Sequence, residues 1–291
     1  MKTIQKITSA LLILSAAAIP VFTFDWPQEN IGSDKFFSFF GQKRAETISN
    51  SLIFAEPETA KVCDKGQVAV IITEHEDGFN WFESTLGNAV IVAHEDSLTT
   101  VYANLDQDNF NKSLFNSTEV TTGTVLSTTG NSAWQEQESF LEFQIIDTKN
   151  HNYINPLILM PRIGKEESLT LTDIKLQNKF GKFYDLDSQK NIPAGVYKVF
   201  RKKQNLAVPY KTTLFVNGAE TEKITFDTLK MSDKNLAVEG RKFYTINELY
   251  IENDLMLMGE LYLPHGKDTI SLIVTDFSGN EKSRIYNVTV F

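Results

Sequence analysis

The stretch at residues 87–105 constrains the fold of this chain more than any other. Residues 90–93, Val-Ile-Val-Ala, form a short apolar run of the kind that fills a buried β-strand. Glu95, Asp96 and Ser97 then provide a turn signal, and residues 98–105, rich in Thr, Val and Tyr, have the composition of a second strand. Two such runs around a short turn predict a β-hairpin in a β domain.

The first residues have the pattern of an export signal. Lys2 and Lys6 provide a positive start, residues 10–21 are apolar, and Ala16, Ala17 and Ala18 offer small side chains for cleavage. We therefore expect residues 1–23 to be a signal peptide and the mature chain to be periplasmic or secreted, with no membrane span. An uncleaved anchor is the alternative, although the apolar run is short for a span.

Composition bounds the remaining possibilities. With 42% hydrophobic residues and 21 Phe in 291 residues, the chain can bury a large core over one or two domains. A net charge of −9 argues against nucleic acid as a partner. Cys63 is the single cysteine, so it forms no disulfide within the chain, and its place at the foot of a probable strand predicts a small buried side chain.

The residue types in this hairpin are more informative than its periodicity alone. Asn-x-Val-x-Val-x-His, a turn, then Thr-x-Tyr-Ala-x-Leu resembles the central hairpin of the LytM/lysostaphin-type zinc metallopeptidases, which cut peptidoglycan cross-bridges. Further similarities follow in the same order: the Trp-Pro … Phe-Gly … Arg entry over residues 26–44, Ala-x-Pro at residues 55–57, and Asn-Pro at residues 155–156. The resemblance implies an all-β, LytM-type antiparallel sheet (duplicated hybrid motif-like) over residues 24–163.

A second domain is expected at residues 168–291. Short candidate strands lie at 169–176, 195–201, 212–217, 223–229, 247–251, 260–263, 269–275 and 284–290, and turn signals separate them. This spacing predicts a β-sandwich, and the last hairpin resembles bacterial immunoglobulin-like domains. Asp276 and Asn280 flank the turn of that hairpin. A plain Asx-type turn is the interpretation we favour there, and a calcium site is the alternative.

The resemblance also locates the zinc site of the family, where three protein ligands hold the metal. The first His ligand falls on Ser49 and the Asp ligand on Ile53. The His-x-His pair falls on Phe140 and Glu142, and the His of Tyr-Ala-His-Leu falls on Asn104. Glu142 alone retains a good ligand atom, so we predict no catalytic residues, no metal and no other cofactor.

The four histidines, at positions 75, 94, 151 and 265, show no paired-ligand spacing. His94 is interpreted as a satisfied structural residue. The sequence therefore predicts an inactive, exported binding or regulatory module whose former active site is a groove lined by Ser49, Asn104, Phe140 and Glu142. Its partner would be peptidoglycan or an envelope protein such as a wall hydrolase. The alternatives are an active peptidase with a relocated metal site and a purely structural envelope protein.

Overall fold

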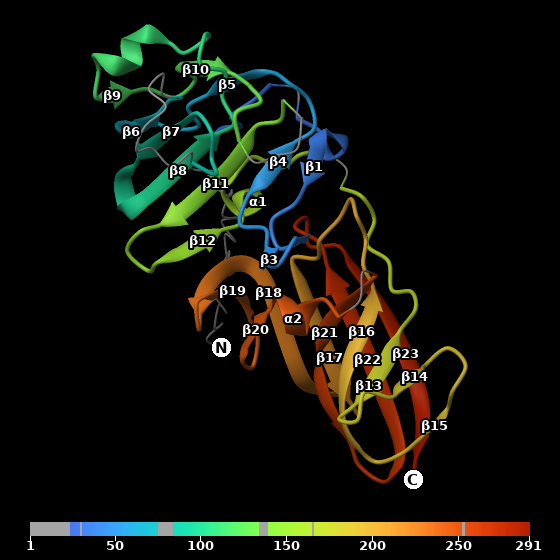
Figure 1. Cartoon of the computed structure of the whole chain (residues 1–291). Helices are drawn as coiled ribbons and strands as arrows, with labels where there is room; N and C mark the ends of the chain where they lie inside the picture. The colour runs from blue at the N-terminus through green and yellow to red at the C-terminus, as the bar shows by residue number, and fades with distance from the viewer. Residues whose placement is uncertain (1–23, 30, 75–83, 134–138, 165, 252–253) are drawn as a thin grey trace, which may run out of the picture.

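The computed structural model describes residues 24–29, 31–74, 84–133, 139–164, 166–251 and 254–291. The predicted signal peptide therefore lies outside the described residues. The described chain is almost entirely β-structure, as predicted, and Figure 1 shows its N-terminal and C-terminal parts arranged end to end. Within this described portion, no helix is both long and apolar enough to cross a membrane.

The N-terminal part contains short antiparallel strands. They are β1 (Phe36–Ser38), β2 (Lys43–Arg44), β3 (Thr47–Ile48), β4 (Leu52–Phe54), β5 (Thr59–Lys61), β6 (Gly66–Ile72), β7 (Ala89–Ala93), β8 (Leu98–Ala103), β9 (Glu119–Val120), β10 (Val125–Thr128), β11 (Glu142–Asp147) and β12 (Asn152–Ile154). Short 3₁₀ turns occur at Ser33–Lys35, Glu95–Ser97 and Lys112–Phe115, and helix α1 spans Pro156–Leu159.

The predicted hairpin is confirmed and lies inside the main sheet. Strands follow one another in the order β12-β11-β8-β7-β6-β9, and β4 joins the outer end of β11 beside β1. In the hairpin, Val90 of β7 faces Tyr102 of β8. Both are completely buried, which explains why this stretch is so apolar. Asp96 and Ser97 adopt left-handed backbone angles (φ 59° and 62°) and make the turn.

The C-terminal part contains the remaining elements. They are β13 (Lys175–Asn178), β14 (Phe183–Asp185), β15 (Asn191–Ile192), β16 (Gly195–Lys202), β17 (Lys211–Val216), β18 (Ala219–Ser232), β19 (Asn235–Glu239), β20 (Phe243–Thr245), helix α2 (Ile246–Leu249), β21 (Leu255–Leu263), β22 (Gly266–Thr275) and β23 (Glu281–Val290).

These strands form two layers, ordered β15-β23-β22-β17-β18 and β14-β13-β16-β21. Side chains from both layers meet in one buried apolar cluster, for example Val199 and Leu261 from one layer with Leu214 and Leu272 from the other. The predicted sandwich is therefore present, and the immunoglobulin-like assignment stays a prediction. The predicted turn is present, but its carboxylate closes it across four residues rather than the two of a plain Asx turn: Asp276 accepts hydrogen bonds from the backbone N (2.7 Å) and Nδ2 (2.9 Å) of Asn280.

Two predicted strands differ from the structure. The strand expected at 169–176 begins only at Lys175, and the one expected at 247–251 is wrong. These residues instead overlap α2, which begins after Thr245. The carboxylate of Glu248 accepts a hydrogen bond from the backbone N of Thr245 (3.3 Å), as the Thr-x-x-Glu spacing of a capping box allows. Ile246 and Leu249, three residues apart, are both buried on one face of this turn.

The two parts share a sheet and a core. Tyr153 of β12 pairs with Leu229 of β18, so the main sheet continues from one part into the other (Figure 1). We use the term shared core for the apolar cluster to which both parts contribute. It includes Phe40, Leu52, Phe54, Phe143 and Met160 from the N-terminal part, and Phe200, Phe226, Leu229, Tyr244 and Leu257 from the C-terminal part. Each part therefore buries apolar surface of the other.

Candidate functional site

The residues at the family's zinc positions come together around the outer ends of β4 and β11. Glu142, the first residue of β11, lies between two neighbours in register: Ile53 of β4 and Ala103 of β8. Directly opposed residues on adjacent strands have Cβ atoms about 5 Å apart. The two positions that the resemblance assigns to an Asp and a His ligand, Ile53 and Glu142, are therefore next to each other, as one metal site would require.

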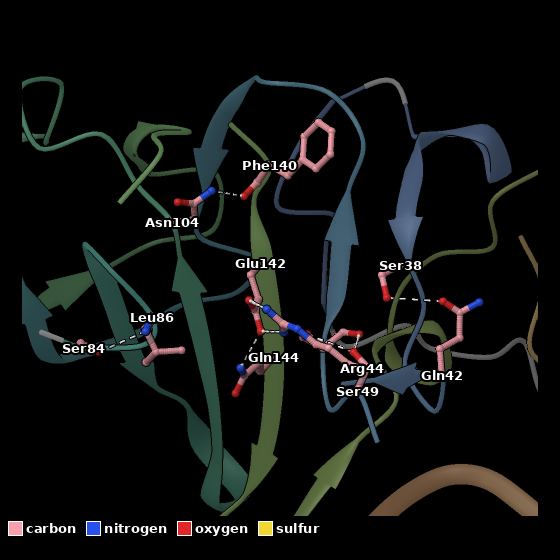
Figure 2. A network of polar contacts seen from close by, with 11 residues as sticks. Ser38, Gln42, Arg44, Ser49, Ser84, Leu86, Asn104, Phe140, Glu142 and Gln144 are labelled. Carbon is pink, nitrogen blue, oxygen red and sulfur yellow. Dashed lines mark hydrogen bonds and ion pairs between the residues drawn. The ribbon is translucent and has the colours of Figure 1, made fainter. Parts of the chain in front are cut away.

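An arginine occupies the centre of this site. Arg44 Nη1 donates to Glu142 Oε1 (2.7 Å) and Arg44 Nη2 donates to Glu142 Oε2 (3.1 Å), as Figure 2 shows. Gln144 Nε2 also donates to Glu142 Oε1 (3.3 Å). The Glu142 side chain is 4% exposed and that of Arg44 is 34% exposed. A two-pronged guanidinium–carboxylate contact of this kind is short, oriented and charge-assisted.

Arg44 is positioned by the tight β2–β3 hairpin, of which it is part. Arg44 pairs with Thr47 across a two-residue turn in which Ala45 has a φ of 50°. Ser49 follows this hairpin directly and is 1% exposed. Its hydroxyl contacts the carbonyl oxygen (3.3 Å) and the hydroxyl (3.4 Å) of Ser51. The position of the first His ligand is therefore held by a small side chain that bonds to its own loop.

Asn104 organises the other end of the site. Its Nδ2 donates to the carbonyl oxygen of Phe140 (2.8 Å), and its Oδ1 accepts from the backbone N atoms of Ser132 and Ala133 (both 2.9 Å). Its backbone is left-handed, with a φ of 63°, a conformation that Asn tolerates better than most residues. The side chain thus ties three chain segments together.

The burial of these residues corrects the predicted groove. Ser49, Asn104 and Glu142 expose 1%, 0% and 3% of their surfaces, because each is hydrogen-bonded inside the domain. They lie beneath the surface and cannot line an open groove. Phe140 is the one member of the predicted set that is partly exposed, and its ring packs on that of Phe37 at 5.1 Å between centroids. Phe37 is 59% exposed.

The donor set does not fit a zinc ion. Ile53 has no donor atom, and both carboxylate oxygens of Glu142 face the guanidinium of Arg44. A zinc ion bound to this carboxylate would be repelled at short range by the positive charge of Arg44. Within the described ranges, no group of three His, Cys, Asp or Glu side chains is arranged to hold a metal.

The histidines do not gather at this site. His94 uses both ring nitrogens, at 2.8 Å from the carbonyl oxygen of Lys65 and 2.7 Å from Thr100 Oγ1, in agreement with its interpretation as a structural residue. His151 and His265 are exposed in turns. His75 lies outside the described residues.

Cys63 is buried, as predicted, and belongs to the fold. It is fully buried, its backbone N donates to the hydroxyl of Tyr102 (2.8 Å), and that hydroxyl donates to Cys63 Sγ (3.0 Å). Burial raises the pKa of the Cys63 thiol to about 12, although the hydrogen bond with Tyr102 lowers it in part. A thiol in this setting is a poor nucleophile at neutral pH.

Sequence reasoning did not identify Arg44 as part of the site. The Phe-Gly … Arg pattern marked its position, but the pattern carries no information on its partner. The signal that could have revealed such a partner is the Glu at position 142, where the family has a His. A buried carboxylate requires a cation or several hydrogen-bond donors.

Two parts of this chain match models of protein families. A model for peptidase family M23 matches residues 53–156, and a second family model, which carries no description, matches residues 168–291. An uncharacterized protein of Treponema pallidum (strain Nichols) is 32% identical over 125 residues, which cover 40% of this chain and 82% of that protein.

Two solved structures are also similar. A mutant of the catalytic domain of the prophage-encoded M23 protein EnpA from Enterococcus faecalis is 16% identical, with a TM-score of 0.34 over 42% of this chain and 87% of that chain. The SpoIIQ–SpoIIIAH pore-forming complex provides a match at 18% identity, with a TM-score of 0.35 over 47% of this chain and 90% of that chain. The family model spans the strands from β4 to β12, on which the sequence motifs fall in the expected order, and residues 53–156 of this chain therefore form an M23-type domain.

Proposed function

We propose that this protein is an exported, catalytically inactive M23 module that binds or regulates a component of the cell envelope. The single observation that carries the proposal is the ion pair between Arg44 and Glu142 at the family's zinc position. Zinc-dependent hydrolysis needs a Lewis acid and a metal-activated water. A guanidinium fixed on the remaining carboxylate supplies neither.

The proposed location rests on the first residues of the sequence. Their positive start, apolar stretch and small residues fit a secretory signal peptide. Edman sequencing of the mature protein and cell fractionation test this part. A chain recovered intact in the cytoplasm would contradict it.

The proposed partner is peptidoglycan or an envelope protein such as a wall hydrolase. The partly exposed ring pair of Phe37 and Phe140, of which Phe140 lies two residues before Glu142, offers an apolar contact for a peptide or a sugar face. The C-terminal sandwich, which we predict to be immunoglobulin-like, would provide a second docking surface.

The first experiment is to measure bound zinc in the purified mature protein by mass spectrometry, after zinc addition and dialysis. We expect a zinc content near zero and no release of peptides from peptidoglycan. The matched control rebuilds the family's ligands in one chain: Ser49→His, Ile53→Asp, Glu142→His and Arg44→Ala. This variant is expected to retain about one zinc per chain, because the register of β4 and β11 places two of its new ligands side by side.

The two alternatives give different outcomes. Stoichiometric zinc in the natural chain, together with peptidoglycan hydrolysis, would overturn the proposal in favour of a relocated metal site. Sedimentation with purified peptidoglycan separates a wall-binding module from a purely structural protein. In that assay Phe37→Ser and Phe140→Ser should release the protein from the pellet, while Phe180→Ser, at an 80% exposed position in the C-terminal part, serves as the control.

A further inference from the structure

A pocket of about 200 Å³ lies where the N-terminal and C-terminal parts meet. The N-terminal part contributes Phe37, Gln42 and Lys43 to its lining, and the C-terminal part contributes Lys203 and Gln204 among others. Neither part contains this pocket alone. It is also separate from the Arg44–Glu142 pair, whose residues do not line it.

The lining of this pocket is positively charged in a protein of net charge −9. Lys43 and Lys203 both line it, and no Asp or Glu does. Over the described part of the chain, neither lysine forms a salt bridge. Two cations that face the same cavity without a carboxylate repel each other, and an anion between them removes that repulsion.

A third cation lies next to the lining of the pocket, bonded to two lining residues. Arg201 of β16 is completely buried, and its guanidinium is bound by neutral groups: the carbonyl oxygens of Thr170 (3.2 Å) and Lys202 (3.3 Å), Gln204 Oε1 (3.3 Å) and Met256 Sδ (3.6 Å). Two of these partners, Gln204 and Met256, also line the pocket.

The Arg201 guanidinium is not fully satisfied by these contacts. Its Nε has no hydrogen-bond partner among the described residues. Burial lowers the pKa of Arg201 to about 10, so the side chain is still charged at neutral pH. A buried charge is costly unless a counter-charge is near, and an anion in the adjacent pocket would provide one.

The walls of the pocket are held by contacts between the two parts. Gln42 Nε2 donates to the carbonyl oxygen of Asn205 (2.7 Å), and the hydroxyl of Tyr250 donates to the carbonyl oxygen of Gly41 (2.7 Å). Both bonds join the segment before β2 to the C-terminal part. A ligand would therefore enter a site whose backbone is already positioned, which lowers the cost of binding.

We propose that this junction pocket binds the oxyanion group, a carboxylate or a phosphate, of a small ligand. Lys43 and Lys203 would contact the anion, and the charge of Arg201, behind the lining residues Gln204 and Met256, would also attract it. Phe37 and the amides of Gln42 and Gln204 would contact the body of the ligand. The pocket shares Phe37 with the Phe37–Phe140 ring pair, but no residue at the family's zinc positions lines it, and the inference does not depend on whether that centre is active.

The test is calorimetric titration of the full mature protein at low ionic strength with three probes: inorganic phosphate, glutarate and its neutral analogue glutaramide. We expect saturable binding of phosphate, glutarate or both, and none of glutaramide. The preferred anion identifies the oxyanion class. Binding should weaken as sodium chloride is raised, because the lysines are partly exposed to screening.

Charge-removing variants locate the site. Lys43→Gln and Lys203→Gln should each weaken binding about fivefold, and the double variant about 25-fold, as expected when each lysine makes a solvent-exposed ionic contact. Lys267→Gln, an exposed position at the start of β22 without a salt bridge in the described structure, should bind as the natural chain does. Equal affinity of the double variant and the natural chain, equal loss in Lys267→Gln, binding of glutaramide, or no saturable binding of either anion would overturn the proposal.

Discussion

Replacing Arg44 by Met tests whether the former metal centre now depends on an ion pair. The substitution keeps a long side chain but removes both donors to Glu142, at 2.7 and 3.1 Å. The Glu142 carboxylate, 4% exposed, would then be buried without its cation. Removing one partner of a fully buried pair costs about 3–5 kcal/mol.

The expected cost for Arg44→Met is lower than that range. Because the Arg44 side chain is 34% exposed, water can partly replace it. We therefore expect a loss of about 2–3 kcal/mol in the free energy of unfolding. In a chain of this size the loss corresponds to a fall of about 4–10 °C in Tm. Urea denaturation followed by circular dichroism and tryptophan fluorescence measures the first quantity, and calorimetry measures the second.

A double-mutant cycle isolates the pairwise part of this energy. Glu142→Gln should cost less than Arg44→Met, about 1–2 kcal/mol, because the arginine left behind can be hydrated while the carboxylate cannot. The double variant should be less destabilised than the sum of the single variants by about 1–2 kcal/mol. Lys65→Met, which breaks the exposed pair with Glu95, is the control and should leave stability unchanged within error. Additive single costs would refute the role assigned to the Arg44–Glu142 pair.

Three further predictions concern the thiol, the buried amide and the division of the chain. Cys63, whose pKa is raised to about 12, should resist iodoacetamide at pH 8 in the native protein and react fully in guanidinium; labelling at the rate of an exposed thiol would contradict its burial. Asn104→Ala should destabilise more than Asn104→Gly by about 1 kcal/mol in urea denaturation, because both lose the side-chain bonds but only Ala resists the positive φ; equal costs would remove that explanation. A chain that ends after residue 163 should show no cooperative thermal unfolding, because it exposes its side of the shared core; a sharp transition would show that the N-terminal part folds alone.

Local pattern was sufficient for the parts of the fold in which neighbours in sequence are neighbours in space. The β7–β8 hairpin was predicted because its apolar run, its turn and its Thr-rich strand are consecutive. The turn at Asp276 and Asn280 was predicted for the same reason. The burial of Cys63 followed from its place at the foot of a predicted strand.

Features that depend on long-range contacts were not predictable in this way. Arg44 and Glu142 are 98 residues apart, and the residues around Arg44 do not indicate that it pairs with a buried carboxylate. The pairing of β12 with β18 crosses the boundary that the change of pattern near residue 164 suggested. Helix α2 was taken for a strand because its four residues are too few to show helical periodicity.

The site residues show how strand ends can be held together at the positions that the resemblance assigns to zinc ligands. A zinc ion would connect positions 49, 53 and 142, and without it the same segments must be held by other contacts. In this chain Arg44 reaches from the β2–β3 hairpin to Glu142 of β11, and Asn104 joins the end of β8 to the backbone beside Phe140. Both links are directional hydrogen bonds between the segments that a metal would otherwise connect. As a result, the Glu142 carboxylate, the one group at these positions that could bind a metal, is bonded to the guanidinium of Arg44. Zinc binding at these positions would therefore require the removal of Arg44 as well as the presence of the family's ligands.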